Sequence, residues 1–122
     1  MTITLNHTIV WARDKEGAAR FFAEIFGLRF EGSGGHFAPV RINGTLTLDF
    51  ADATGTIAGQ HYAFHVSDPE SDAILQRVKD AGAFGSGPRS LEDGKLNAWN
   101  GGRGFYYKDH DGHVVELMTL PQ

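Results

Sequence analysis

The sequence predicts an α+β fold built from two βαβββ modules, with the helices packed on the outer face of each sheet. One observation behind this prediction is that the order of strand-like and helix-like segments in the first half recurs in the second half. A second is a shared register. His7 lies seven residues before Asp14, the expected cap of the first helix. His61 lies seven residues before Asp68, the expected cap of the second helix.

The first module begins with residues 2–11, where polar and apolar residues alternate as they do in a strand. Asp14 then supplies an N-cap, and apolar residues recur at helical spacing until Gly27, which ends the helix. Three further strands are expected at residues 28–31, 37–42 and 45–51. The last two flank Asn43-Gly44, a dipeptide typical of hairpin turns.

The second module repeats this order. Residues 60–66 alternate as a strand, and Asp68 followed by Pro69 marks the start of a helix that ends at Gly82. The remaining strands are expected near residues 83–84, 104–109 and 113–119. The loop over residues 85–102 is much longer than its counterpart in module one. It is also rich in glycine, as segments that border a binding site often are.

Size and composition limit what the chain can be. Its 122 residues suit a single domain over residues 1–122, with module one at about 1–54 and module two at about 57–120. The net charge of −4 is spread along the chain without a basic patch, so we expect no nucleic-acid partner. No apolar run is long enough for a membrane partner. The absence of cysteine and of a signal-peptide pattern leads us to expect a cytoplasmic protein.

Strand alternation gathers possible metal ligands on the concave side of the sheets. His61 and Glu116 each point away from the apolar face of their strand, and the duplication directs His7 to the same side. Asp49 lies there too, but its side chain is short, and whether it reaches the others stays open. Two imidazoles with one or two carboxylates suit one divalent ion, Fe, Mn, Zn, Ni or Co, with positions left for substrate. Taken singly, each of these residues also fits a structural role.

Further residues are candidates for a substrate pocket. His65 lies four residues past His61, about 13 Å along an extended strand, too far to share the ion, so a pocket role and a structural role both stay open. Alternation lets only one of two adjacent tyrosines face the cavity, and we choose Tyr106 over Tyr107 as a hydrogen-bond donor. Core packing is the alternative for either tyrosine. The long loop is expected to close over the ligand with Trp99, Asn100 and Arg103.

These features resemble the vicinal oxygen chelate superfamily, which includes glyoxalase, bleomycin resistance proteins, extradiol dioxygenases and fosfomycin-resistance transferases. The resemblance covers nearly the whole chain. Leu-Asn-His at residues 5–7 is similar to the first ligand motif of the superfamily, and His-Tyr-Ala-Phe at residues 61–64 to its second. Residues 109–116 are similar to its closing pattern Asp-Pro-Asp-Gly-His-x-x-Glu, with His110 in place of the proline.

The resemblance implies one metal ion held by His7, His61 and Glu116 in a U-shaped half-barrel, and a homodimer. Glyoxalase I enzymes carry a fourth ligand, a glutamate, on the strand where Asp49 lies here, so a strict glyoxalase I assignment is in doubt. Fosfomycin transferases carry a threonine where this chain has Ile9, a pocket position. That difference argues against a fosfomycin activity, although Tyr106 matches a tyrosine of those enzymes.

The leading hypothesis from the sequence is a lyase or isomerase that binds a small oxygenated substrate on the metal and stabilises an enolate. Asp49 or Glu116 would act as general base if it left the metal. An Fe(II) extradiol-type ring-cleaving dioxygenase is the alternative within the enzyme class. A metal-free drug-binding protein of the bleomycin-resistance type is the alternative outside it. The intact set of His7, His61 and Glu116 argues against the binding protein, whereas Trp11 and Trp99 would supply it with a stacking surface.

Overall fold

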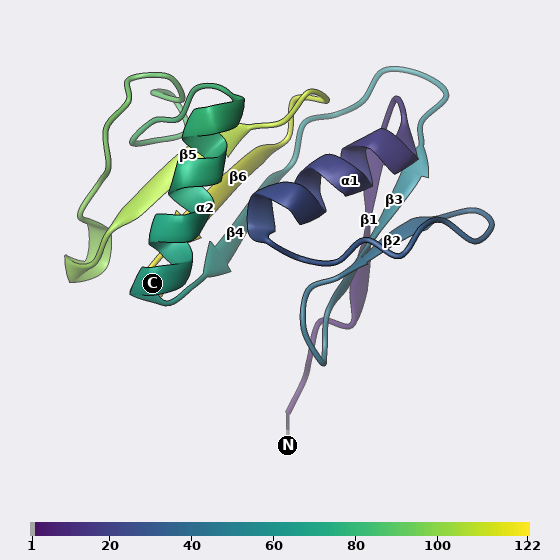
Figure 1. The fold of residues 1–122 in the computed structure, drawn as a ribbon, viewed down its shortest axis with the longest axis horizontal. Coiled ribbons are helices and arrows are strands. Elements are labelled where there is room, and N and C mark those ends of the chain that lie inside the picture. Colours follow the sequence, from purple (N-terminus) through teal and green to yellow (C-terminus); the bar gives the residue numbers. More distant parts are fainter. Residues whose placement is uncertain (1) are drawn as a thin grey trace. The chain divides into compact units, whose positions relative to one another are not determined.

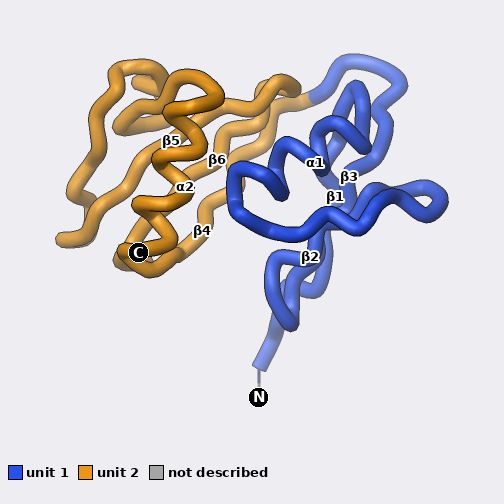
Figure 2. The backbone as a smooth tube through the Cα atoms, in the orientation of Figure 1, with its two compact units in different colours: residues 1–57 blue, residues 58–122 orange. Residues whose placement is uncertain are grey.

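The computed structural model describes residues 2–122, and the chain divides into two compact units between residues 57 and 58 (Figure 2). Each unit has one α-helix and three strands in the order strand, helix, strand, strand, which confirms the α+β class and the duplicated modules. The elements in chain order are β1 (His7–Ala12), α1 (Lys15–Phe26), β2 (Ala38–Arg41), β3 (Thr47–Asp52), β4 (His61–His65), α2 (Asp68–Ala81), the 3₁₀-helix η1 (Trp99–Gly101), β5 (Gly104–Lys108) and β6 (Val114–Met118).

In the first unit the strands form a mixed sheet in the order β1-β3-β2, with β1 parallel and β2 antiparallel to β3. Helix α1 covers one face of this sheet (Figure 1). Phe22 of α1 is buried and its ring lies 5.9 Å from that of Phe50 on β3. The core of the unit therefore lies between α1 and the sheet, and the other face of the sheet is left for a site.

Helix α1 begins and ends where the sequence predicts. The Asp14 carboxylate accepts a hydrogen bond from the Gly17 N–H at 3.2 Å, and Gly27 ends the helix in the left-handed conformation with φ 70°. The next residue, Leu28, donates its N–H to the carbonyl of Ala23 at 2.8 Å. Because Leu28 completes the helix end in this way, residues 28–31 do not form the short strand that the sequence suggested.

The second unit has the same topology, with the strand order β4-β6-β5 and helix α2 on one face (Figure 1). The predicted cap of α2 is wrong by one residue, because Ser67 and not Asp68 caps it. The Ser67 hydroxyl accepts the Glu70 N–H at 3.2 Å, and the Glu70 carboxylate accepts the Ser67 N–H at 2.9 Å. This reciprocal capping box satisfies two N–H groups at once.

Two further predicted strands differ clearly from the structure, whereas the others differ by one or two residues at their ends. Strand β1 begins at His7 and not at residue 2, since its partner β3 begins at Thr47, directly opposite His7. In the second unit, residues 83–84 lie outside the named strands, and Gly85 forms an isolated bridge to Tyr106 instead. Neither helix of residues 2–122 has the length and apolar character needed to cross a bilayer.

Candidate functional site

The two sheets carry their candidate carboxylates in the same register. Asp49 on β3 pairs with Ile9, which lies two residues after His7 on the parallel neighbour β1. Glu116 on β6 pairs with Ala63, which lies two residues after His61 on the parallel neighbour β4. Asp49 is therefore the counterpart of Glu116 in the duplicated module. This equivalence rests on strand pairing and so does not depend on the corrected helix cap.

Each sheet keeps its helix-free face open in the way that alternation predicts. On β4 His61, Ala63 and His65 are exposed, whereas Tyr62 and Phe64, which point to the other face, are partly buried. On β6 Glu116 is half-buried, between the fully packed Val115 and Leu117. His61 and Glu116 therefore stand on the same open face of the second unit.

The strongest contact on that face joins His61 to Glu116. The imidazole Nε2 of His61 lies 2.9 Å from the carboxylate Oε1 of Glu116. The His61 side chain is 48% exposed and that of Glu116 is 12% exposed, so solvent reaches the pair from the imidazole side. Two ligands bound at right angles to one ion, each at about 2.1 Å, lie about 3 Å apart. The pair thus has the donor types and the spacing of two adjacent metal ligands.

Tyr106 on β5 stands next to this pair, directly opposite Glu116 across the antiparallel β5–β6 ladder. Burial raises the pKa of Tyr106 far above its ordinary value, and the neighbouring Glu116 raises it further. The phenol therefore stays protonated. The ring of His61 lies 5.7 Å from that of Tyr106, which brings three candidate residues together in one cluster.

The neighbouring Tyr107 points to the opposite face. It is buried, and its hydroxyl has no hydrogen-bond partner. Burial raises the pKa of Tyr107, and the charge of Asp109 adds to the effect. The two adjacent tyrosines thus differ in one respect that matters for the site, since Tyr106 faces Glu116 across the ladder and has its ring beside that of His61.

The long loop brings Trp99 against Tyr106. The two rings meet edge to face with centroids 5.6 Å apart, and Trp99 remains 49% exposed. Asn97 fixes the loop, because its Nδ2 donates to the Ser86 carbonyl at 3.0 Å and its Oδ1 accepts the Trp99 N–H at 3.3 Å. Asn100 follows in a left-handed conformation with φ 59°. Trp99 is therefore a partly exposed aromatic wall beside the cluster.

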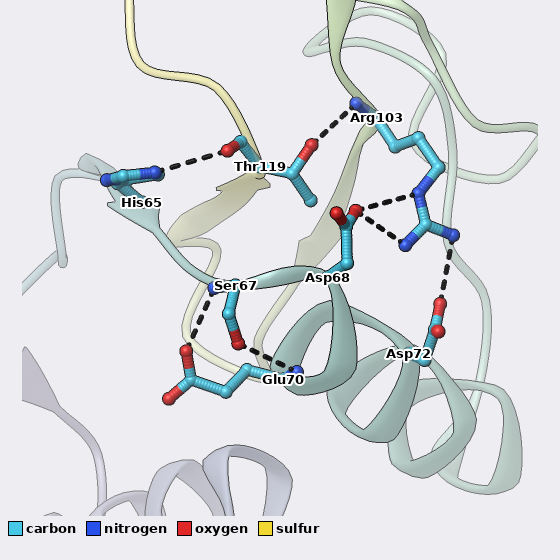
Figure 3. A network of polar contacts seen from close by, with 7 residues as sticks. All are labelled: His65, Ser67, Asp68, Glu70, Asp72, Arg103 and Thr119. Atoms are coloured by element: carbon cyan, nitrogen blue, oxygen red, sulfur yellow. Dashed lines mark hydrogen bonds and ion pairs between the residues drawn. The ribbon is translucent and has the colours of Figure 1, made fainter.

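The Arg103 side chain points toward the start of α2 (Figure 3). Its guanidinium donates to Asp68 at 2.8 and 3.2 Å and to Asp72 at 3.0 Å, both at the start of α2. Its backbone N–H donates to the Thr119 hydroxyl at 2.8 Å. His65 joins the same network, since its Nε2 donates to the Thr119 carbonyl at 3.2 Å. Arg103 thus anchors the end of the loop to α2, and the pocket roles of Arg103 and His65 stay predictions.

The remaining candidates belong to the first unit. His7 is exposed and its Nδ1 lies 2.8 Å from the Asn6 side-chain oxygen. Ile9 is 37% exposed on the same face of β1, and Asp49 is half-buried on β3. Across residues 2–122 no three His, Asp or Glu side chains are grouped as a metal site requires. The structure brings together His61, Glu116 and Tyr106, and the ligand roles of His7 and Asp49 stay predictions.

Sequence reasoning missed several residues that shape this region. The capping pair Ser67 and Glu70 had a visible signal, the pattern Ser-x-x-Glu before an apolar helix. Asn97 had none, because its role depends on the loop conformation. The contacts of Arg103 with Asp68 and Asp72 join residues that are 35 and 31 positions apart, and no local pattern reveals such pairs.

Known proteins are similar to this chain in sequence and in fold. A family model described as the glyoxalase/bleomycin resistance protein/dioxygenase superfamily matches residues 4–117. The solved structure of oxidase ChaP-H2 is 44% identical with a TM-score of 0.93, covering 99% of this chain and 96% of that one. Oxidase ChaP-H1 is 40% identical with a TM-score of 0.92, covering 98% of each chain. Fosfomycin resistance protein FosX from Mesorhizobium loti shares the fold alone, at 22% identity and a TM-score of 0.73 over 99% of this chain and 95% of that one. The chain belongs to the glyoxalase/bleomycin resistance protein/dioxygenase superfamily.

Proposed function

We propose that this protein is a metal-dependent oxidase that acts on a small oxygenated organic molecule. The observation that carries the proposal is the 2.9 Å contact between His61 Nε2 and Glu116 Oε1 on an open sheet face. The similarity to two oxidases, at 44% and 40% identity, favours oxidative chemistry over the lyase or isomerase that the sequence alone put first.

The proposed ligands of the metal are His7, His61 and Glu116, with Asp49 as a candidate for a fourth position. Two imidazoles and one carboxylate are the donor set typical of non-haem Fe(II) oxygenases, so Fe(II) is the favoured ion among the five candidates. When bound, that ion supplies one-electron chemistry with dioxygen and a Lewis acid for a substrate oxygen.

The remaining residues of the cluster act on the substrate. Tyr106 stays protonated beside His61 and would donate a hydrogen bond to the substrate. Trp99 is partly exposed beside Tyr106 and would cover one side of a bound molecule, which excludes water from it. We also propose that the protein acts as a homodimer.

A glyoxalase-like lyase or isomerase is the second candidate. It is favoured by the register of Asp49, which occupies the position in module one that Glu116 occupies in module two. A second carboxylate at an equivalent position suits an enzyme that moves a proton, because one carboxylate can bind the ion while the other acts as base.

The test is metal reconstitution followed by oxygen measurement. Metal-free protein is loaded separately with Fe(II), Mn(II), Zn(II), Ni(II) or Co(II), and bound metal is measured by elemental analysis. Oxygen uptake is then followed with an oxygen electrode across a panel of catechols and hydroxyketones. The expected result is one tightly bound ion per chain and oxygen uptake with the Fe(II) form.

Two variants make this test specific. His61→Ala should lose most of the bound metal, whereas His65→Ala, an exposed histidine on the same strand, should retain it. Turnover without oxygen uptake would favour the lyase, and ligand binding without any metal would favour the binding protein. Equal metal contents in wild type and His61→Ala would overturn the proposed site.

A further inference from the structure

A side chain anchors the residue that precedes β4. The N–H of Gln60 donates to the imidazole Nδ1 of His113 at 3.0 Å. The carbonyl of Gln60 accepts the Val114 N–H at 2.8 Å, so both backbone polar groups of Gln60 are bonded at the start of β6. Within a parallel ladder the acceptor of such an N–H is a backbone carbonyl. The ring of His113 takes that place where the β4–β6 ladder ends, at the pair of His61 and Val114.

We infer that His113 is a positioning residue, which fixes the entry of β4 and thereby holds the His61 imidazole against the Glu116 carboxylate. All of these residues belong to the second unit, so the inference needs nothing from the first. It rests on the proposed function only in treating the pair of His61 and Glu116 as part of the site. It goes beyond that function in giving a role to a buried histidine that precedes β6.

The hydrogen bond fixes the protonation of the His113 ring. A backbone N–H can only donate, so the Nδ1 of His113 accepts and carries no proton. The proton of the neutral imidazole is then on Nε2. His113 is 1% exposed, and its ring meets that of Tyr62 edge to face with centroids 5.9 Å apart. Because it is packed in this way, the ring has little freedom to turn away from the Gln60 N–H.

The turn before β6 directs the ring toward β4. The Asp109 carboxylate Oδ1 accepts the N–H groups of Asp111 and His113, both at 2.9 Å. The Asp109 N–H donates in turn to the His113 carbonyl at 2.9 Å. Gly112 lies in this turn with φ 87°, a left-handed conformation that glycine adopts without strain. The His113 side chain therefore leaves a turn whose shape is set by several hydrogen bonds.

Gly59 shows how closely the two segments approach. A Cβ at Gly59 would lie 2.7 Å from the Gly112 carbonyl oxygen, so any side chain there would push the turn away. The segment before β4 is thus docked on the turn by a steric fit as well as by hydrogen bonds. His61 lies two residues after Gly59, and its Nε2 is 2.9 Å from the Glu116 Oε1. The position of His61 therefore depends on how this segment is docked.

The experiment separates the acceptor from the bulk of the ring. His113→Asn keeps an acceptor, because the Asn Oδ1 can occupy the place of Nδ1, whereas His113→Leu fills the space without one. In the metal-free proteins, hydrogen exchange of the Gln60 N–H should be about 10-fold faster in His113→Leu. It should stay close to that of wild type in His113→Asn. Equal exchange in wild type and His113→Leu would overturn the inference.

Gly59→Ala is a second probe, which leaves the His113 ring in place. Its Cβ would push the turn away, so exchange of the Gln60 N–H, corrected for its intrinsic rate, should again be faster. If His113→Leu did not fold, this variant would carry the test, and unchanged exchange in it would overturn the inference.

A second readout tests the positioning of His61. At fixed pH the ¹⁵N resonances of the His61 imidazole in the metal-free protein report its contact with Glu116. They should shift in His113→Leu and keep their wild-type positions in His113→Asn, which also lacks the ring. Val78→Ala, in the buried face of α2, is the control for a general loss of stability and should leave them unshifted. Unshifted resonances in His113→Leu, or equal shifts in Val78→Ala, would overturn the positioning role.

Co(II) binding separates this inference from the proposed function. The dissociation constant, measured by isothermal titration calorimetry, should rise about 10-fold in His113→Leu, as it does when a residue that orients a ligand is lost. It should be unchanged in His113→Asn, and an unchanged constant in His113→Leu would overturn the inference. A wild type that binds no Co(II) would count against the proposed function alone, because hydrogen exchange and the His61 resonances are measured without metal.

Discussion

Asn97 and Gly104 exchange both of their backbone hydrogen bonds, with the Asn97 N–H 2.9 Å from the Gly104 carbonyl and the Gly104 N–H 3.1 Å from the Asn97 carbonyl. This isolated antiparallel bridge closes the segment that carries Trp99. It therefore couples the end of the long loop to β5, the strand on which Tyr106 lies.

Gly104→Ala should destabilise the protein. The added Cβ would lie 2.7 Å from the Asn97 Oδ1 and 3.0 Å from the Leu117 carbonyl, so strand or loop must shift. A loss of about 1–3 kcal/mol in the free energy of unfolding is expected from such overpacking, and urea denaturation measures it. Gly34→Ala is the control, because nothing lies within 4 Å of a Cβ at that position. Equal effects of the two substitutions would contradict the close packing described at Gly104.

Tyr107→Phe should stabilise the protein. The Tyr107 hydroxyl is buried without a partner, and burial of an unsatisfied polar group opposes folding. Its removal should raise the free energy of unfolding by about 1 kcal/mol, measured by thermal or urea denaturation. A loss of stability in Tyr107→Phe would mean that the Tyr107 hydroxyl is satisfied in solution.

Arg103→Ala should loosen the loop more than it lowers global stability. The ion pairs of Arg103 with Asp68 and Asp72 are exposed, and such pairs contribute little to the free energy of unfolding. They do anchor the last residue before β5 to α2, so their loss should speed hydrogen exchange of the Gly102 N–H, which donates to the Trp99 carbonyl. Arg103→Lys keeps the charge but lacks the planar guanidinium group. Its hydrogen-exchange rate should lie between those of wild type and Arg103→Ala. Unchanged exchange in Arg103→Ala would show that the ion pairs with Asp68 and Asp72 do not anchor the loop.

The capping box of α2 predicts a pH dependence. The hydrogen bonds from the backbone and side chain of Ser67 lower the pKa of Glu70, which is a carboxyl group whose ordinary value is 4.5. A depressed pKa means that the contribution to stability is present above the ordinary value and is lost as the pH falls through the lower, folded value. Between about pH 5 and pH 2.5, wild type should therefore lose more stability than Glu70→Gln, whose amide fits the box without titrating.

The effect is small because Glu70 is exposed, so it is best read as a difference between the two proteins in parallel urea titrations. Other carboxyl groups titrate in the same pH range, and their contributions to stability cancel in the difference between the two proteins. If the free energy of unfolding fell equally with pH in wild type and Glu70→Gln, the Ser67–Glu70 capping box described above would be contradicted.

Much of the fold could be predicted because its signals are local. Asp14 and Gly27 mark the two ends of α1, and Asn43 accepts the N–H groups of two of the following residues in the hairpin turn. Alternation along β4 and β6 assigns faces correctly, since one side of each strand packs against α2. Alternation also predicted that His61 and Glu116 share a face, and the pairing of β4 with β6 brings them into contact.

Ser67 and Asp68 are both good caps, and the local pattern Ser-x-x-Glu, which places Glu70 three residues after Ser67, decides for Ser67. The rest depends on contacts that no local pattern encodes. Trp99 meets Tyr106 through a loop whose course is set by side-chain bonds of Asn97, not by hydrophobic periodicity. The segment 28–31 has strand-like composition, but the helix end uses the amide of its first residue.

Pro39 has a consequence for self-association of the protein. Strand β2 is the last strand in the order β1-β3-β2 of its sheet, and outer strands are templates for pairing with other chains. Proline lacks an N–H, so an added strand would find one donor missing in the middle of the four residues of β2. Pro39, the cross-strand partner of Asp49 on β3, thus makes this edge a poor nucleus for aggregation.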